Sequence, residues 1–260
     1  MNILDQLAAH ARERVEAAKQ RVPLEVVKQQ ALALPKGDFR FEQALKKPGL
    51  SFICECKKAS PSKGLIAQDF PYLQIAKDYE TAGADAISVL TEPKWFLGSD
   101  AYLQEIASTV RTPCLRKDFT VDEYMIYKAK LLGASAVLLI CAILSDAQLK
   151  EYLALCDTLG LSTLVEAHDA QEVDRALAAG ARILGVNNRN LKDFTVDTEN
   201  SRRLRAKIPA GVLFVSESGV KTPEDVAALR DSGADAVLIG ETLMRAPDKT
   251  AKLRELKGLL

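Results

Sequence analysis

Six polar side chains stand at or just beyond the ends of short apolar runs that have the composition of buried strands. They are Glu55, Lys57, Lys117, Glu166, Asn187 and Glu217. A charge is costly to bury unless it is paired or used. Parallel strands present their carboxyl ends on one side of the sheet, so the six predict a single polar mouth. A lysine acid opposite a glutamate base in such a mouth suits acid–base chemistry on a sugar carbonyl or hydroxyl.

The ionisation of two groups decides which acts as acid and which as base. We expect Lys57 and Lys117 to face each other across the mouth, where like charges lower the pKa of a lysine. Glu166 follows the apolar pair Leu164-Val165, so burial is expected to raise its pKa towards that of a working base. A Schiff-base role for Lys117 is the alternative, because some aldolases also place a lysine at a strand end.

A few other side chains are weaker candidates for catalysis or substrate binding. His168 lies two residues beyond Glu166 and is expected to cap a helix or to be exposed in a loop. Phe96, with Trp95, could pack on an aromatic substrate ring or only within its own loop. Arg189 could pair with a substrate carboxylate or with a neighbouring acid.

The chain that positions these side chains alternates apolar segments with amphipathic ones. From Leu50 onward, strands are expected at residues 51–57, 86–91, 113–117, 136–140, 162–166, 182–187, 212–217 and 236–239. Helices are expected at residues 71–82, 101–109, 121–132, 146–159, 170–179, 198–206, 223–232 and 248–257. Strands as continuously apolar as residues 136–140 are typical of a parallel sheet that is covered on both faces.

A Gly-Ala pair recurs at residues 83, 133, 180 and 233, and each pair is expected to end a helix and to precede a strand. The interval of about fifty residues is the length of two strand–helix units. Eight such units predict an α/β fold, a (β/α)8 TIM barrel, over residues 49–260. Residues 1–48 are expected to form an N-terminal helical extension packed on the barrel. A doubly wound open sheet is the alternative, but no G-x-G-x-x-G motif follows the first strand.

Two glycine-containing segments near the C-terminus predict a phosphate site. Ser218 and Gly219 follow the seventh expected strand, while Gly240 and Glu241 follow Ile239 at the end of the eighth. Glycines let backbone N–H groups approach an anion, and a short helix is expected after Gly240. In a barrel, the loops after the last two strands and a helix N-terminus form the usual phosphate site.

Charge and composition exclude several classes of protein. The 35 basic and 35 acidic residues give a net charge of zero. The net charge therefore does not indicate binding to nucleic acid or to an anionic membrane. No apolar run approaches the roughly 20 residues of a membrane span and no signal peptide is evident, so a cytoplasmic location is expected. The five cysteines form no C-x-x-C pair and are expected to be buried, reduced thiols. With two histidines, a metal site lacks ligands.

Six motifs carry a resemblance to a known enzyme family. They are Glu55-Cys56-Lys57-Lys58-Ala59-Ser60-Pro61-Ser62, Leu115-Arg116-Lys117-Asp118-Phe119, Leu164-Val165-Glu166, Gly185-Val186-Asn187-Asn188-Arg189-Asn190-Leu191, Ser216-Glu217-Ser218-Gly219 and Ile239-Gly240-Glu241-Thr242-Leu243-Met244. In this order and at barrel spacing, they make the chain closely resemble the indole-3-glycerol phosphate synthases of tryptophan biosynthesis. The resemblance runs through essentially the whole chain.

The resemblance implies a carboxy-lyase that converts 1-(2-carboxyphenylamino)-1-deoxyribulose 5-phosphate to indole-3-glycerol phosphate. Ring closure, decarboxylation and dehydration would proceed without a cofactor or a metal. The partner would be a small phosphosugar-anthranilate substrate, with no nucleic acid and no membrane, and we expect a monomer.

The resemblance also implies roles for individual residues. Lys117 would be the general acid at the ribulose carbonyl, Glu166 the general base of the later dehydration, and Lys57 a contact of the substrate carboxylate. The residues implied in orienting groups and stabilising charge are Glu55, Asn187 and Glu217. Those implied in binding the substrate, its phosphate and its anthranilate ring are Ser60, Arg189, Ser218, Gly219, Ile239, Gly240, Glu241, Phe96, Phe119 and Leu138. The segment 60–64 would be a loop that closes over the ligand.

Two further alternatives fit the residues less well. A phosphoribosyl isomerase would rely mainly on Asp or Cys as acid and base, and no Asp ends an expected strand in the required places. A barrel that only binds sugar phosphates or serves as a scaffold would be expected to lack the catalytic acid or base. Lys117 and Glu166 are both present.

Overall fold

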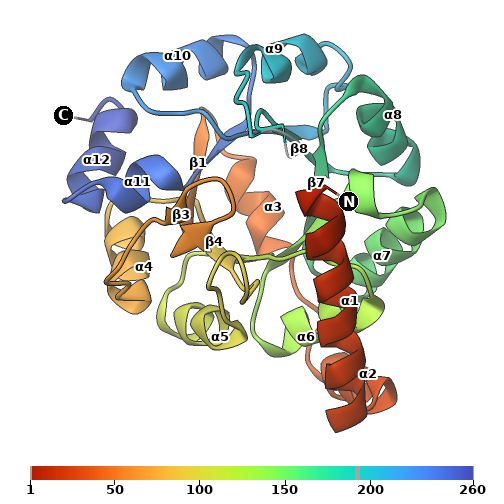
Figure 1. Cartoon of the computed structure of the whole chain (residues 1–260). Helices are drawn as coiled ribbons and strands as arrows, with labels where there is room; N and C mark the ends of the chain where they lie inside the picture. The colour runs from red at the N-terminus through yellow and green to blue at the C-terminus, as the bar shows by residue number, and fades with distance from the viewer. Residues whose placement is uncertain (1, 191–193, 260) are drawn as a thin grey trace.

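A computed structural model describes residues 2–190 and 194–259 of the chain. Eight parallel strands close into a barrel in the order β1-β10-β9-β8-β7-β6-β5-β4, and helices surround it (Figure 1). The barrel strands are β1 (Ser51–Cys56), β4 (Ala86–Leu90), β5 (Cys114–Lys117), β6 (Ala136–Ile140), β7 (Ser162–Ala167), β8 (Ile183–Asn187), β9 (Leu213–Glu217) and β10 (Ala236–Ile239). Strand β1 pairs with both β10 and β4, which closes the ring. The predicted (β/α)8 barrel is confirmed, and the open sheet is excluded.

The helices of the outer ring match the predicted segments to within two residues at each end. They are α4 (Tyr72–Thr81), α5 (Asp100–Thr109), α6 (Glu123–Leu131), α7 (Asp146–Leu159), α8 (Ala170–Ala179), α9 (Glu199–Arg205), α10 (Pro223–Asp231) and α12 (Lys249–Leu256). The short helix expected after Gly240 is α11 (Glu241–Arg245). A two-stranded hairpin, β2 (Ala59–Ser60) with β3 (Gly64–Leu65), and the 3₁₀ turn η1 (Cys141–Ile143) were not predicted, because both are too short to show a period.

The repeated Gly-Ala pairs end helices as predicted. Gly83 and Gly133 both have φ of +81°, a backbone conformation that glycine adopts without a Cβ penalty. After each glycine, the alanine N–H donates back to a carbonyl of the last helical turn: Ala84 to Tyr79 over 2.9 Å and Ala134 to Ala129 over 3.0 Å. This bond turns the chain out of the helix and into the next barrel strand.

Three helices precede the barrel: α1 (Ile3–Arg21), α2 (Leu24–Ala33) and α3 (Arg40–Leu45). Helix α1 lies against α6 and η1, and α2 lies against α6. Helix α3 lies at the end of the barrel where the strands begin, because Ser162, the first residue of β7, accepts the backbone N–H of Glu42 on its hydroxyl. The division into an extension of residues 1–48 and a barrel of residues 49–260 stays a prediction.

The barrel strands are buried along almost their whole length, as their continuous apolar composition predicts. All five cysteines are buried and free, which confirms the prediction of reduced structural thiols. Within residues 2–190 and 194–259, no helix combines the length and the apolar composition needed to cross a membrane.

Candidate active site

A cavity of about 740 Å³ opens at the carboxyl ends of the barrel strands. It is lined by every residue that the sequence predicts for catalysis or binding. The strand register explains the convergence, because Asn187 and Glu217 face each other as the last pair of β8 and β9, and Lys117 ends β5 opposite Leu90. The structure therefore brings the predicted residues together, while their individual roles stay predictions.

Lys117 lies between two carboxyl groups. Its Nζ is 3.8 Å from Oε2 of Glu166 and 3.9 Å from Oε2 of Glu217. Burial alone would lower the pKa of Lys117, but Glu166, Glu217 and Glu55 together raise it well above its ordinary value. The expectation of a lysine pKa lowered by a second lysine is wrong for Lys117, because the groups closest to its ammonium are the carboxyls of Glu166 and Glu217 rather than Lys57.

The pKa of Glu166 also departs from the sequence prediction. Burial raises it, as predicted, but the nearby Lys117 ammonium and His168 outweigh burial and lower the pKa of Glu166 to about 2. Asn187 supports the charged form by donating from Nδ2 to Oε1 over 3.3 Å. The expectation of a raised pKa is therefore wrong, and Glu166 is a carboxylate throughout the neutral range.

Glu217 is the carboxyl that retains a proton. Its burial and the neighbouring Glu166 charge raise the pKa of Glu217 to about 8, as two close carboxyls cannot easily both ionise. Its Oε1 has no hydrogen-bond partner among the described residues. A Cβ at Gly185 would lie only 2.2 Å from this oxygen, so the glycine of β8 makes room for the Glu217 carboxyl.

Glu55 and Lys57 form the ion pair at the end of β1. Lys57 Nζ lies 2.8 Å from Oε1 of Glu55, and Ser88 donates to Oε2 of Glu55 over 3.2 Å. Burial raises the pKa of Glu55, but Lys57 and Lys117 outweigh it and lower the pKa below its usual value. A Cβ at Gly240 would lie 2.5 Å from Oε1 of Glu55 and 2.8 Å from Nζ of Lys57, so a larger residue there would displace this ion pair.

One side of the cavity is apolar. Phe96 and Phe119 pack with ring centroids 6.0 Å apart, and Leu138 of β6 lines the same cavity. Trp95, by contrast, packs edge-on against His10 with centroids 5.4 Å apart and is not among the residues that line the cavity. Of the aromatic pair considered in the sequence, only Phe96 faces the site.

The other side of the cavity carries the glycine turns and charged groups. Ser218 and Gly219 both have positive φ, +68° and +101°, and Ser218 donates from its hydroxyl to Oδ1 of Asn187 over 3.0 Å. Ser60 of the β2–β3 hairpin also lines the cavity, as do Ile239, the last residue of β10, and Gly240, which follows it. Glu241 Oε2 is 4.0 Å from Nη2 of Arg189.

Sequence reasoning missed several residues of the site. Ile3 and Leu7 of α1 and Asp118 after β5 line the cavity, beside Lys63 of the segment 60–64 that is expected to close over the ligand. No local pattern connects α1 to the barrel mouth, so the first two could not be found. Leu191, the last residue of the motif that begins at Gly185, lies outside the described residues.

His168 is neither exposed nor a helix cap, and the sequence expectation for it is wrong. Its Nε2 lies 3.3 Å from Oε1 of Glu166, and its Nδ1 lies 3.2 Å from Oε2 of Glu172. The sequence could have indicated this position, because residues i and i+2 of an extended chain share a face. That period puts His168 on the same side as Glu166.

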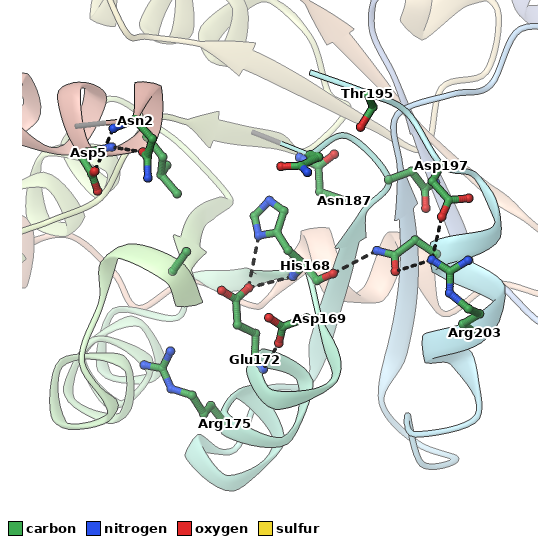
Figure 2. A pocket seen from close by; sticks show the side chains of 15 residues that line it. Asn2, Asp5, His168, Asp169, Glu172, Arg175, Asn187, Thr195, Asp197 and Arg203 are labelled. Atoms are coloured by element: carbon green, nitrogen blue, oxygen red, sulfur yellow. Dashed lines mark hydrogen bonds and ion pairs between the residues drawn. The ribbon is translucent and has the colours of Figure 1, made fainter. Parts of the chain in front are cut away.

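A second, polar cavity of about 630 Å³ lies behind Glu166 and shares Asn187 with the first. Figure 2 shows His168 and Glu172 on its wall. Within the described part of the chain, no cluster of three or more His, Cys, Asp or Glu side chains could hold a metal ion.

Comparison with known proteins identifies relatives along the whole chain. The family model described as indole-3-glycerol phosphate synthase matches residues 4–256. The curated indole-3-glycerol phosphate synthase of Ruminiclostridium cellulolyticum is 60% identical over 98% of this chain and 99% of its own. That of Endomicrobium trichonymphae is 54% identical over 98% of this chain and 99% of its own.

Solved structures at low identity share the fold alone. A 3-hexulose-6-phosphate synthase superposes with a TM-score of 0.65 at 15% identity, covering 81% of this chain and 100% of that one. A thiamine phosphate pyrophosphorylase from Pyrococcus furiosus gives a TM-score of 0.60 at 15% identity, covering 84% of this chain and 96% of that one.

Proposed function

The chain belongs to the indole-3-glycerol phosphate synthase family, and on that premise we propose that Lys117 is its general acid and Glu166 its general base. The activity is that of a carboxy-lyase of tryptophan biosynthesis. It converts 1-(2-carboxyphenylamino)-1-deoxyribulose 5-phosphate to indole-3-glycerol phosphate, with loss of carbon dioxide and water. The observation that carries the assignment is the Lys117 ammonium, which lies within 4 Å of both Glu166 and Glu217.

Ring closure needs a proton at the ribulose carbonyl as the aromatic carbon attacks it. The carboxylates around Lys117 outweigh its burial and raise its pKa, so it is charged and able to donate at neutral pH. Donation turns the carbonyl oxygen into a hydroxyl, and loss of carbon dioxide then restores the aromatic ring. Departure of that hydroxyl as water requires a proton on its oxygen, which a lysine of the site donates, and removal of a proton from the CH2 next to the ring nitrogen, for which Glu166 is the base.

The remaining charged groups would hold the substrate carboxylate until it leaves. Lys57, paired with Glu55 over 2.8 Å, is placed to contact that carboxylate. Asn187 and Glu217 line the same cavity and would orient the reacting groups. Fixed charges in a largely buried site stabilise developing charge without the reorganisation that water would need.

The two sides of the cavity match the two ends of the substrate. Phe96, Phe119 and Leu138 offer an apolar wall for the anthranilate ring, on which aromatic side chains pack well. The opposite wall would bind the phosphate and the sugar through Ser60, Arg189, Ser218, Gly219, Ile239, Gly240 and Glu241. Lys63 of the β2–β3 hairpin, 3.7 Å from Glu241, adds a positive charge to that wall.

The assignment is tested by replacing the acid and the base separately. Lys117→Ala is expected to abolish the growth of indole fluorescence, while affinity for the product stays within about tenfold, or 1.4 kcal/mol. Glu166→Gln is expected to lose turnover in the same way. The matched control is Lys150→Ala, which removes an exposed lysine of α7 and should behave as the wild type.

Two results would contradict these roles. Near-full turnover of Lys117→Ala would show that Lys117 is not the general acid. Borohydride trapping of the substrate on Lys117 would show that it forms a Schiff base instead. The raised pKa of Lys117, held by the neighbouring carboxylates against the effect of burial, favours the acid, because a Schiff-base nucleophile must be an uncharged amine.

Three further expectations belong to this proposal. We propose that turnover needs no metal or organic cofactor, so that a chelator leaves the rate unchanged. We also propose a cytoplasmic location, which cell fractionation tests, and the absence of a nucleic-acid partner, which a filter-binding assay tests.

A further inference from the structure

His168 lies between two carboxylates at the point where β7 leads into α8. Its Nε2 is 3.3 Å from Oε1 of Glu166, and its Nδ1 is 3.2 Å from Oε2 of Glu172. Nδ1 is hydrogen-bonded to Glu172, whereas Nε2 lies at ion-pair distance from Glu166 without the alignment of a hydrogen bond. A ring with a carboxylate beside each nitrogen is favoured in the form in which both nitrogens carry a proton. The arrangement is that of an imidazolium bridging the proposed base to a second acid.

Two hydrogen bonds hold the backbone of His168, in addition to the contact of its ring with Glu172. Oε2 of Glu172 also accepts the backbone N–H of His168 over 2.8 Å, and Asn200 donates to the His168 carbonyl over 3.1 Å. Figure 2 shows Glu172 reaching from α8 to the His168 ring. The His168 side chain is about one-fifth exposed, and the Glu166 side chain is almost fully buried. The His168 side chain is therefore held beside Glu166.

The two carboxylate oxygens of Glu166 have different neighbours. Oε1 faces the imidazole and accepts a hydrogen bond from Asn187 over 3.3 Å. Oε2 faces Lys117 in the reaction cavity, at 3.8 Å. One oxygen is thus occupied by the protein, and the other is directed towards the space where the substrate would lie.

The charged groups around His168 favour its protonated form. Burial lowers the pKa of His168, but Glu166 and Glu172 outweigh burial and raise it to about 10. The other charged side chains on the wall of the second cavity, from every element packed there, are Asp5 of α1, Asp169 and Arg175 of the α8 segment, and Asp197 and Arg203 of the α9 segment. Arg203 is paired with Asp197 over 2.7 Å and Arg175 with Asp146 over 2.6 Å, so the direct ion-pair partners of the two arginines are other carboxylates than Glu166 and Glu172.

We propose that His168, held by Glu172, is a positioning residue for the reaction. As an imidazolium it fixes Oε1 of Glu166 and keeps the group ionised, which leaves Oε2 as the oxygen that accepts the proton during dehydration. This inference rests on the proposed role of Glu166 as the base and extends it to a three-residue chain, Glu172–His168–Glu166.

Two variants of His168 distinguish its effect on the orientation of Glu166 from the effect of its positive charge. His168→Gln keeps an N–H donor near Oε1 of Glu166 but carries no charge, whereas His168→Leu has neither a donor nor a charge. We expect kcat to fall about tenfold in His168→Leu and about threefold in His168→Gln, with KM within about threefold in both, because a small misplacement of a catalytic group acts on the chemical step. Partial rescue by the glutamine distinguishes positioning from mere packing.

The pH dependence of kcat reports the charge effect. Loss of the imidazolium raises the pKa of Glu166, because one of the positive charges that favour its ionised form is gone. The acidic limb of the kcat profile should therefore move to higher pH, by about one unit, in both His168 variants. Glu172→Gln, which leaves His168 in place but weakens its charge, should move the limb in the same direction by less.

The matched control is Asp169→Ser. It removes a neighbouring carboxylate that has no contact with Glu166 among those the structure gives, and serine retains the capping bond that Asp169 accepts from the Glu172 N–H. Its kcat and pH profile should equal those of the wild type. If His168→Leu does not fold, as judged by circular dichroism, the inference is tested by the kcat and pH profiles of His168→Gln and Glu172→Gln.

The outcomes for the base and for its positioning residue are distinguishable. If Glu166→Gln is inactive while the His168 variants have wild-type kcat and pH profiles, the inference about His168 is overturned and the base stands. If Glu166→Gln retains near-full turnover, the proposed base itself fails. A fall in kcat without a shift of the acidic limb would reduce His168 to a packing residue and would also overturn the inference.

Discussion

Glu166 and Glu217 are the same residue type in the same cavity, yet they have opposite ionisation states. Both are almost fully buried, and burial raises the pKa of each carboxyl. Lys117 lies within 4 Å of both carboxyls, but Glu166 also has His168 and Asn187 as partners, whereas Oε1 of Glu217 has no hydrogen-bond partner among the described residues. The partners, rather than the depth of burial, separate a carboxylate from a carboxylic acid, a pattern typical of acid–base sites.

The ionisation of Glu217 predicts a pH-dependent stability. Its pKa is raised in the folded state, by burial and by Glu166, to about 8. Folding therefore gains from its proton below pH ~4.5, and that gain is lost as the pH rises towards 8. Glu217→Gln removes this loss, so its free energy of unfolding relative to the wild type should increase by about 1–3 kcal/mol between pH 4.5 and pH 8.

Urea unfolding of both proteins at the two pH values measures this difference. The variant is expected to lose activity as well, since Glu217 lines the cavity, so stability and turnover are measured separately. An equal free-energy difference at both pH values would contradict the raised pKa.

At the scale of elements, helix α1 is bonded to the strand that carries the proposed acid. Arg14 of α1 contacts Asp118 with both terminal nitrogens, over 3.2 and 2.6 Å. Asp118 directly follows Lys117 and is fully buried, and Thr91 donates to it over 2.6 Å. The extension of residues 1–48 thus helps to hold the end of β5.

Arg14→Ala is expected to destabilise the protein by about 2–4 kcal/mol, because it leaves a buried carboxylate with a weaker counter-charge. Arg116 Nη2, 3.6 Å from Asp118, compensates in part. Displacement of the adjacent Lys117 should lower kcat by about tenfold. Chemical unfolding and steady-state kinetics measure the two effects.

Lys19→Ala on the same helix is the matched control. Lys19 pairs with Asp122 over 2.7 Å, but both side chains are about one-quarter exposed, and such pairs contribute about 0–1 kcal/mol. If Arg14→Ala were no worse than Lys19→Ala in stability and kcat, helix α1 would have no role in holding β5.

At the scale of the whole molecule, the closed barrel leaves no sheet edge exposed for pairing with another chain. Each barrel strand has two strand neighbours, which removes the commonest template for edge-to-edge association. The exposed large apolar side chains include Val22, Val26, Leu32 and Leu34, which lie at the end of α1 and along α2. This segment is the surface that a dimer would be expected to use.

We predict a monomer in solution, with the mass of a single chain by light scattering over a range of concentrations. The four apolar side chains are partly exposed and scattered on helical turns, and isolated exposed apolar groups are normal for monomers. A dimer that Val26→Lys and Leu32→Lys dissociate would contradict the prediction and assign α2 as the interface.

The sequence alone determined the order of strands and helices and the residues that meet at the barrel mouth. Apolar periods and the recurring Gly-Ala pairs are local, and once they imply a parallel barrel, topology alone brings Glu55, Lys117, Glu166 and Glu217 to one end. For the same reason all the predicted site residues line one cavity.

Only the tertiary structure decided the ionisation states and the supporting contacts. The pKa of Glu166 depends on whether burial or Lys117 prevails, and that balance changes over a few ångströms that no sequence spacing specifies. The contact of Arg14 with Asp118 joins residues 104 positions apart, and the chain between them carries no pattern that would indicate it. Residue types and periods fix which groups converge, whereas charge depends on distances that exist only after folding.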